Sequence, residues 1–443
     1  MADNTTIKYK NSVHLDNEEI HNVASTLLGY LDVLHKASEK SVYDVPESFL
    51  HLPSDVDLYT KNEEMVGKLS NNSLKYIIVV GIGGSNLGAM AVYDALYPKF
   101  DAFRSRFPKM LFADTNNPSE MEILKQIIVG NVNDPKEIVL NIITKSGATV
   151  ETVANAMFLF GVLSEKFGEN HAIDQTVITT DEGSPLWNIA REKDMHVLPI
   201  PKNIGGRYSI FSHAGIFPLR LAGVNASEFL KGAVSMRNTL WSSAPDENPA
   251  LLLAVMDFLV HKKKLTIYNS FFFNSEMESV GRWGRQLVAE SLGKKYDNEH
   301  KTIYAGMTPI VSIGSTDLHS MVQLYLGGPR DKFTNFIYAD GAEEGRCAVP
   351  VHSPFQTLVP DIVGKDFQKI MSSILGGTME AYKEMAFPYI ETVLPRISER
   401  FLGEYFMLKM SETVLLAKLW NINAFDQPEV ESYKKVAREL LKK

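Results

Sequence analysis

Residues 76–96 read YIIVVGIGGSNLGAMAVYDAL: an apolar run of strand length, then a glycine-rich turn, then a helical pattern. Further apolar runs of strand length, most of them followed by small or polar residues and a helical pattern, lie at 110–113, 138–143, 176–179 and 196–200. A second series begins near residue 265 and continues at 309–313 and 335–338. This alternation is typical of βαβ units around a parallel sheet, so the sequence predicts an α/β protein with two lobes.

Helical patterns precede, connect and follow these runs. They predict helices within 17–35, 232–264, 366–393 and 402–419, and a lysine-rich helix at the end of the chain. We therefore divide the chain into an N-terminal helical segment (1–50), a first lobe (51–205), connecting helices (206–264), a second lobe (265–420) and a C-terminal helix (421–443).

The composition argues against several classes of protein. Of the 443 residues, 45% are hydrophobic and 22% are charged, as in an ordinary folded chain. The net charge of −8 and the lack of a basic tract argue against nucleic-acid binding. The longest apolar stretch, Leu251 to Val260, is about half a membrane span and contains Asp257, so we expect a cytoplasmic protein. The single cysteine, Cys347, and the histidine spacings predict neither a disulfide nor a metal site.

The glycine-rich turn, GIGGSNLG at 81–88, predicts an anion site. Glycines allow a ligand to approach the backbone, and N–H groups at the start of the following helix attract anions. Two other interpretations are a purely structural turn and a dinucleotide-binding loop with Asp114 as the ribose-binding acid. The dinucleotide pattern lacks its third glycine, where Asn86 stands, and the P-loop pattern lacks its lysine. The residues assigned to the anion site are Gly83, Gly84 and Ser85.

A second polar loop, TKSGAT at 144–149, also lies between a predicted strand and a predicted helix. Three hydroxyl groups and several backbone donors at a helix N-terminus suit the holding of a phosphate, with no machinery for transferring it. The alternative is that Thr149 only caps the helix. The residues assigned to this loop are Thr144, Lys145, Ser146 and Thr149.

Four more side chains are candidates for charge stabilisation and proton transfer. Arg207 stands in GGRYS, where two glycines let a guanidinium approach a cleft and stabilise an oxyanion. Gln286 and Glu290 are spaced i, i+4 and share one helix face. His319 follows Thr316, which we interpret as a helix cap, so the imidazole is expected in a first helical turn that favours its neutral form. Each residue also has an ordinary alternative: a surface arginine, an exposed glutamate or a structural histidine.

The last signal is NAFDQPEVESYK at 423–434. Asp426 and Pro428 mark a helix start, and Gln427 lies seven residues before Lys434, so the two side chains are expected on one helix face. A solvated terminal lysine is the alternative.

Taken in order, GIGGSNLG, TKSGATVET, GGRYS, AESLGK, GSTDLHS and FDQPEVESYK resemble the glucose-6-phosphate isomerase family, from about residue 75 to 434. The resemblance implies two doubly wound, three-layer α-β-α sugar-isomerase lobes with a helical C-terminal arm. It also implies a homodimer with no metal and no cofactor. The implied reaction interconverts glucose 6-phosphate and fructose 6-phosphate through ring opening and a cis-enediolate, in glycolysis and gluconeogenesis.

The resemblance also assigns roles to residues. Glu290 would move the proton between C2 and C1, and Arg207 would offset the charge of the enediolate. His319, helped by Lys434, would open the sugar ring, and Glu151 would orient the histidine, from the other subunit's lobe in one arrangement. The implied substrate-binding residues are Gly83, Gly84, Ser85, Thr144, Lys145, Ser146, Thr149, Gln286 and Gln427.

The sequence departs from the family pattern in four places. Thr144 replaces a serine and keeps a hydroxyl, whereas Ala148 replaces a threonine and removes one. Glu429 and Tyr433 stand where glycine is common, near Lys434. Two rival functions differ in what they require: a regulator of the same fold would bind sugar phosphate without turnover, and a nicotinamide dehydrogenase would need a dinucleotide-binding loop.

Overall fold

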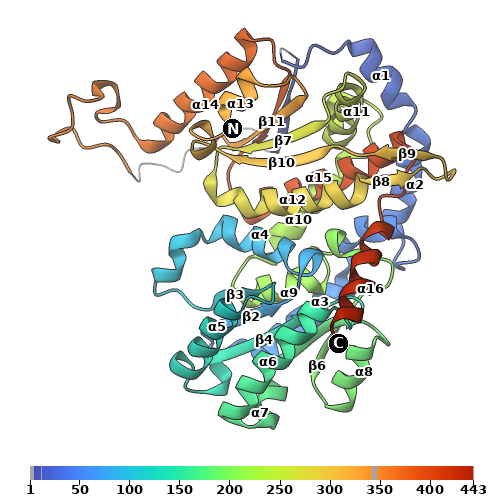
Figure 1. The fold of residues 1–443 in the computed structure, drawn as a ribbon, viewed down its shortest axis with the longest axis vertical. Helices are drawn as coiled ribbons and strands as arrows, with labels where there is room; N and C mark the ends of the chain where they lie inside the picture. The colour runs from blue at the N-terminus through green and yellow to red at the C-terminus, as the bar shows by residue number, and fades with distance from the viewer. Residues whose placement is uncertain (1–3, 11, 342–346, 443) are drawn as a thin grey trace.

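Two α/β lobes are stacked one above the other in the computed structural model (Figure 1). The structure describes residues 4–10, 12–341 and 347–442. The lower lobe is built on a parallel sheet in the order β3-β2-β4-β5-β6. The bounds of these strands, in chain order, are β2 Tyr76–Val80, β3 Lys109–Ala113, β4 Ile138–Ile143, β5 Thr176–Asp181 and β6 His196–Ile200. All five strands predicted in this lobe are confirmed, and strand order reverses between β2 and β4, where ligands usually bind in such sheets.

The upper lobe has a second sheet in the order β1-β12-β11-β7-β10. It is parallel except for the edge strand β1, and its strands are β1 Thr6–Lys8, β7 Ile267–Phe272, β10 Thr308–Ile313, β11 Lys332–Ala339 and β12 Tyr389–Leu394. A small hairpin, β8 Lys294–Tyr296 with β9 Thr302–Ala305, extends from this lobe. The α/β fold with parallel sheets is therefore confirmed.

Helices cover both faces of each sheet and separate the two lobes. Their bounds are α1 Asn17–Ser25, α2 Leu28–Glu39, α3 Val56–Leu69, α4 Leu87–Leu96, α5 Pro118–Asn131, α6 Val150–Phe167, α7 Glu169–Asp174, α8 Pro185–Glu192, α9 His213–Leu221, α10 Ala226–Thr239, α11 Pro249–Lys262, α12 Glu278–Leu292, α13 Val322–Gly327, α14 Phe367–Glu384, α15 Glu399–Leu419 and α16 Glu431–Leu440. The helix α15, buried from Phe401 to Ala417, packs against α10, α11 and α12 at the centre of the largest core. The helix α12 also packs on α4 and so joins the lobes.

Two sequence expectations were wrong in detail, and one strand was not predicted. The helical pattern predicted to reach residue 393 ends at Glu384, and the aromatic and β-branched run YIETVL forms strand β12. The expected helix over 232–264 is two helices, because Pro245 and Pro249 start new turns. The edge strand β1 was missed, since three residues carry no measurable periodicity. None of the helices within the described ranges is long and apolar enough to cross a membrane.

Candidate active site

Arg207 is the centre of a buried network between the lobes. It lies in a short 3-10 helix, Gly206–Tyr208, after β6, and its side chain is 3% exposed. Its Nη1 donates to Glu290 Oε2 at 3.0 Å and to Gln427 Oε1 at 2.8 Å, and its Nε donates to Ser291 Oγ at 3.0 Å. The structure thus brings together four residues, of which Arg207 and Gln427 are 220 positions apart in the sequence.

The remaining donor of Arg207 holds the C-terminal segment in place. Its Nη2 donates to the carbonyl oxygens of Ala424 at 2.9 Å and Asp426 at 3.0 Å. Lys294, also buried, donates to the carbonyl of Asp426 at 2.8 Å and to that of Glu290 at 2.6 Å. Burial lowers the pKa of Lys294, an effect that the carboxylate of Asp426 opposes. The two cations therefore fix the chain that precedes α16 against the C-terminus of α12.

Glu290 is held by a donor on each oxygen. Gln286, one turn earlier on α12, donates from Nε2 to Glu290 Oε1 at 2.9 Å, while Arg207 binds the other oxygen. The predicted shared helix face is therefore correct. The Glu290 side chain keeps 33% of its surface exposed, so a ligand can reach it. A carboxylate oriented in this way is suited to act as a general base.

The glycine-rich turn lies directly against this network. Gly83 has a φ of +59°, and a Cβ there would lie 2.9 Å from Gln286 Nε2. A Cβ on Gly84 would lie 2.3 Å from the carbonyl carbon of Gly206 and 2.5 Å from the backbone nitrogen of Arg207. The residues 83–85 form a short 3-10 helix between β2 and α4. Glycine at 84 is thus required for the two loops to touch.

The hydroxyl loop at 144–149 lies beside the glycine-rich turn, because β2 and β4 are neighbours. Thr144 Oγ1 and Thr149 Oγ1 are 3.0 Å apart, and Ser146 Oγ is 3.5 Å from Thr149 Oγ1. The backbone N–H of Ala148 donates to Ser146 Oγ at 3.3 Å. Thr149 does occupy the N-cap position of α6, but its side chain makes no capping hydrogen bond. The three hydroxyls therefore converge at the start of an 18-residue helix, where an anion is stabilised.

Lys145 and Asp181 support the base of this loop. Lys145 Nζ donates to the carbonyl of Ile204 at 2.9 Å, and burial lowers the pKa of this lysine. Burial also raises the pKa of Asp181 to about 6, against the opposing effect of Lys145 and Lys202. Asp181 was missed in the sequence, although it ends β5 at the same sheet edge as both loops.

The helix α16 crosses the lower lobe beside the hydroxyl loop (Figure 1). Arg438 donates from Nη2 to the carbonyl of Ala148 at 3.4 Å, and Lys434 lies one turn earlier on the same helix face. Lys434 Nζ donates to Glu431 Oε1 at 2.7 Å. Gln427 lies before the helix and contacts Arg207, so the expected pairing of Gln427 and Lys434 along one helix face is wrong.

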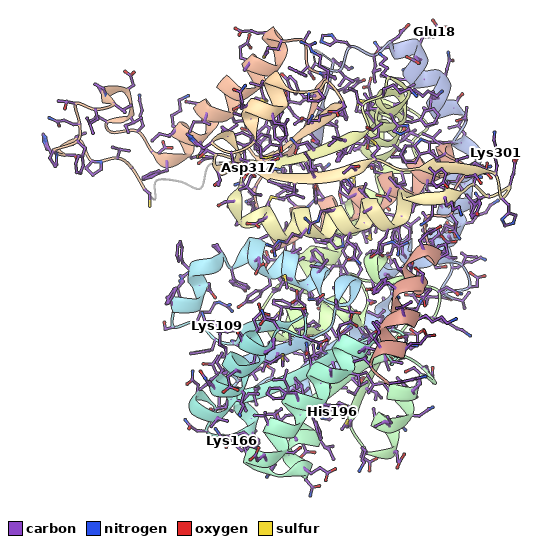
Figure 2. All side chains as sticks on the ribbon, viewed as in Figure 1. Glu18, Lys109, Lys166, His196, Lys301 and Asp317 are labelled. Carbon is purple, nitrogen blue, oxygen red and sulfur yellow. The ribbon has the colours of Figure 1, made fainter. Side chains whose placement is uncertain are left out.

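His319 lies away from Glu290. It is exposed and follows the short 3-10 helix Thr316–Leu318, so the expected first helical turn is wrong; α13 begins only at Val322. The loop of His319 follows β10 at the edge where α12 begins, and Glu290 is twelve residues further along α12, about 18 Å at 1.5 Å per residue. Figure 2 labels Asp317 in the loop of His319 and Lys301 at the opposite end of the lobe.

Glu151, the residue expected to orient His319, lies in the first turn of α6 in the lower lobe. Its backbone carbonyl accepts a hydrogen bond from Asn116 Nδ2 at 3.1 Å. Within the described parts of the chain, no hydrogen bond or ion pair joins Glu151 to His319.

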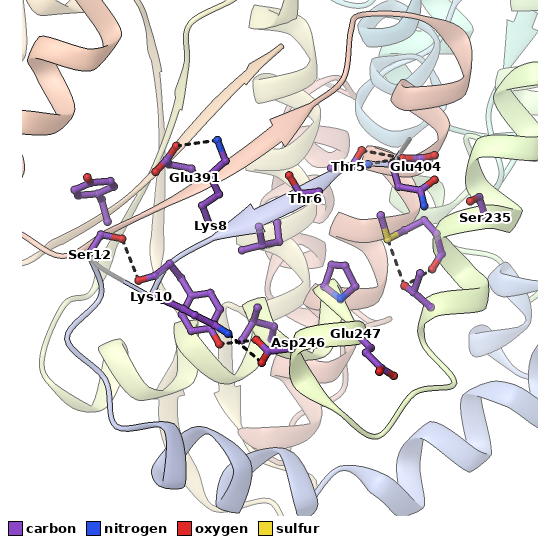
Figure 3. A pocket seen from close by; sticks show the side chains of 18 residues that line it. Thr5, Thr6, Lys8, Lys10, Ser12, Ser235, Asp246, Glu247, Glu391 and Glu404 are labelled. Carbon is purple, nitrogen blue, oxygen red and sulfur yellow. Dashed lines mark hydrogen bonds and ion pairs between the residues drawn. The ribbon is translucent and has the colours of Figure 1, made fainter. Parts of the chain in front are cut away.

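A groove of about 780 Å³ lies elsewhere, beside the edge strand β1 (Figure 3). Charged side chains of this groove already have partners: Lys10 Nζ is 3.3 Å from Asp246 Oδ2, and both the N–H and the hydroxyl of Thr5 donate to Glu404 at 2.9 Å. The network around Arg207 is therefore the better candidate site.

Ser291 and Lys294 are the contacts of this network that sequence reasoning missed. Both lie within the AESLGK segment at 289–294, so that motif carried the signal. Ser291 binds Arg207, and Lys294 binds the chain before α16. Neither contact can be predicted from residue spacing within the motif.

Known proteins resemble this chain over nearly its whole length. A sequence model described as phosphoglucose isomerase matches residues 60–443. A glucose-6-phosphate isomerase of Carboxydothermus hydrogenoformans is 31% identical over 89% of this chain and 84% of its own. A solved structure of a hypothetical protein from Thermus thermophilus has a TM-score of 0.81 at 26% identity, over 97% of this chain and 99% of its own. The fold is also that of a glucose-6-phosphate isomerase from Chlamydia trachomatis, with a TM-score of 0.82 at 18% identity over 100% of this chain and 89% of that one. The chain belongs to the phosphoglucose isomerase family.

Proposed function

We propose that this chain interconverts glucose 6-phosphate and fructose 6-phosphate, a reversible aldose–ketose isomerisation of glycolysis and gluconeogenesis, with Glu290 as the base. Membership of the phosphoglucose isomerase family supports the reaction. The observation that supports Glu290 is its partly exposed carboxylate, bound by Arg207 on one oxygen and by Gln286 on the other.

The phosphate group of the substrate binds at the hydroxyl loop. Ser146 and Thr149 donate hydroxyl hydrogen bonds to it, with Thr144 beside them and Ser85 on the neighbouring glycine-rich turn. The N-terminus of α6 adds its positive dipole, and Lys145 adds a cation at the base of the loop. These contacts persist through the reaction, so they contribute binding more than rate.

The proton transfer takes place at the other end of the sugar. Glu290 removes the proton from C2 of the open-chain aldose and returns it to C1, which gives the ketose. The positive charge of the buried Arg207 guanidinium stabilises the negative charge that develops on the enediolate oxygens, while its five N–H groups stay bonded within the chain. Gln286 and Gln427 hold Glu290 and Arg207 in these orientations.

Ring opening requires a second proton carrier, and we assign it to His319 with Lys434 near the ring. One chain leaves His319 about a helix length from Glu290. A homodimer, in which His319 of the partner subunit enters the site beside Glu151, accounts for this separation. A non-catalytic regulator, the alternative considered above, would bind sugar phosphate without requiring a carboxylate oriented by two donors.

The Glu290→Gln substitution tests the assignment. Glutamine keeps the size and accepts from Arg207, but it cannot take a proton, so turnover falls by about 10² to 10⁴. Exchange of the substrate C2 hydrogen with deuterated solvent, followed by NMR, falls by the same factor. The control is Glu278→Gln, at the exposed start of the same helix, where Glu278 pairs with Arg282. If Glu290→Gln exchanged the C2 hydrogen at the parental rate, another residue would be the proton carrier.

A further inference from the structure

We propose that Arg438, on the C-terminal helix α16, binds the phosphate group of the substrate as a second cation in addition to Lys145. The inference rests on the proposed function, because it names a further contact of the same phosphate site. Arg438 was missed in the sequence, since it lies beyond the end of the last motif, FDQPEVESYK.

The guanidinium of Arg438 lies at the hydroxyl loop, since α16 crosses the lower lobe beside α6 (Figure 1). Its Nη2 donates to the carbonyl oxygen of Ala148 at 3.4 Å. Ala148 has no hydroxyl of its own and stands between Ser146 and Thr149, whose hydroxyl oxygens are 3.5 Å apart. A phosphate bound by these two hydroxyls is therefore within reach of the same guanidinium.

Most of the hydrogen-bonding capacity of Arg438 is available to a ligand. A guanidinium has five N–H groups, and among the described residues the carbonyl of Ala148 is the hydrogen-bond acceptor that Arg438 contacts. The nearby carboxylate of Glu431 is bound by Lys434 at 2.7 Å, and this bond, more than the charge of Arg438, lowers its pKa. The Arg438 side chain is exposed. Arginine can bind two phosphate oxygens at once through parallel N–H groups, so this side chain suits the ligand.

The charges around the hydroxyl loop favour a second cation. A phosphate monoester carries a charge of about −1.5 to −2 at pH 7. Lys145, the cation of the loop itself, donates to the carbonyl of Ile204 at 2.9 Å and interacts with the carboxyl of Asp181. Glu151 adds another carboxylate in the first turn of α6. The positive charge of Arg438 offsets part of this negative charge when the phosphate binds.

The alternative is that Arg438 only holds α16 on the lower lobe. None of the described side chains of this helix is buried, and the bond to Ala148 is the one hydrogen bond described between α16 and the lower lobe. The two roles differ in their kinetics. Holding α16 acts through Lys434 on the rate of ring opening, whereas a phosphate contact that persists through the reaction acts on affinity.

The experiment replaces Arg438 with glutamine in the full chain. Steady-state kinetics with fructose 6-phosphate give KM and kcat, and a phosphorus NMR titration gives the Kd of inorganic phosphate. We expect KM and this Kd each to rise about tenfold, while kcat changes by less than about twofold. The matched control is Arg330→Gln in the upper lobe, where an exposed arginine donates to the carbonyl of Met385 at 3.2 Å. This control is expected to keep the parental values.

A parental Kd for inorganic phosphate in Arg438→Gln overturns the proposal. A lower kcat with an unchanged KM also overturns it, because that result assigns Arg438 to the support of α16. The melting temperature of the variant is expected to match the parent, since the replaced side chain is exposed. A parent that binds phosphate without isomerase activity would instead contradict the proposed function, and the phosphate titrations would still test Arg438.

Discussion

The Arg207 network and the His319 loop both belong to the proposed active site, yet one is complete in a single chain and the other is not. Arg207 is buried and donates five hydrogen bonds to residues from two other segments, α12 and the chain before α16. His319 is exposed, and its described hydrogen bond is the one that its backbone N–H donates to Thr316. Packing within one chain therefore fixes Glu290 and Arg207, the proposed base and its cation, whereas the proposed ring-opening role of His319 requires a partner subunit.

Mixing two inactive variants has the largest expected effect on this comparison. Glu290→Gln and His319→Ala each reduce turnover by about 10² or more. If His319 acts in the partner's site, subunit exchange between the two gives mixed dimers with one intact site of two. Half of the dimers are mixed at equal concentrations, so activity returns to about a quarter of the parental value. The measurement is the coupled isomerase assay before and after exchange.

The control mixture combines Glu290→Gln with Arg207→Lys, two changes on the same side of the site. Every mixed dimer then has a defect in each site, and no activity returns. Failure of the first mixture to recover, with mixed dimers demonstrated by mass spectrometry, would place His319 in the site of its own chain.

Arg207→Lys tests how far the network is structural as well as catalytic. A lysine keeps the charge but cannot bind Glu290, Ser291 and the two C-terminal carbonyls together. Unpaired buried polar groups cost about 1–3 kcal/mol each, so we expect the free energy of unfolding to fall by about 3 kcal/mol in urea titrations.

The matched control for this change is Arg220→Lys. Arg220 pairs with Glu63 at 2.8 Å, and both side chains are more than a third exposed, so the loss is at most about 1 kcal/mol. Equal losses in the two variants would mean that the buried network adds nothing to stability.

Asp181→Asn has the smallest expected effect and concerns the base of the hydroxyl loop. The folded pKa of Asp181 is raised to about 6, so the folded state binds more protons than the unfolded state between about pH 4 and 6, and stability is lost as pH rises through this window. Asparagine removes that loss. We expect the variant's stability relative to the parent to increase by about 1 kcal/mol from pH 4.5 to 7, a value reduced for partial exposure.

Chemical denaturation at several pH values measures this difference. Taking the difference from the parent cancels the pH dependence that other groups contribute to stability. One such group is His213, whose pKa burial lowers to about 4 and whose effect on stability has the opposite slope with pH. The control is Glu182→Gln, a change at the adjacent exposed residue. A flat difference for Asp181→Asn would mean that its carboxyl is solvated.

The sequence predicted most where local pattern and structure coincide. The five strands of the lower sheet, the two loops that follow β2 and β4, and the pairing of Gln286 with Glu290 all depend on neighbours in the chain. β12 was missed because a short run at the end of a helical pattern fits either period. The roles of Ser291 and Lys294 could not be predicted, because they bind groups more than 80 positions away.

The contact between Gly84 and Gly206 limits how this sequence can drift in evolution. An alanine at 84 would place its Cβ 2.3 Å from the neighbouring backbone, whereas at 206 the nearest atom would be 3.3 Å away. The second change needs a shift of a few tenths of an ångström, and the first needs the two loops to separate, together with the guanidinium and the carboxylate that they position. Descendants of this chain that retain catalysis are therefore free to replace Gly206 before Gly84, and a lineage that has lost Gly84 is expected to have lost selection on the reaction.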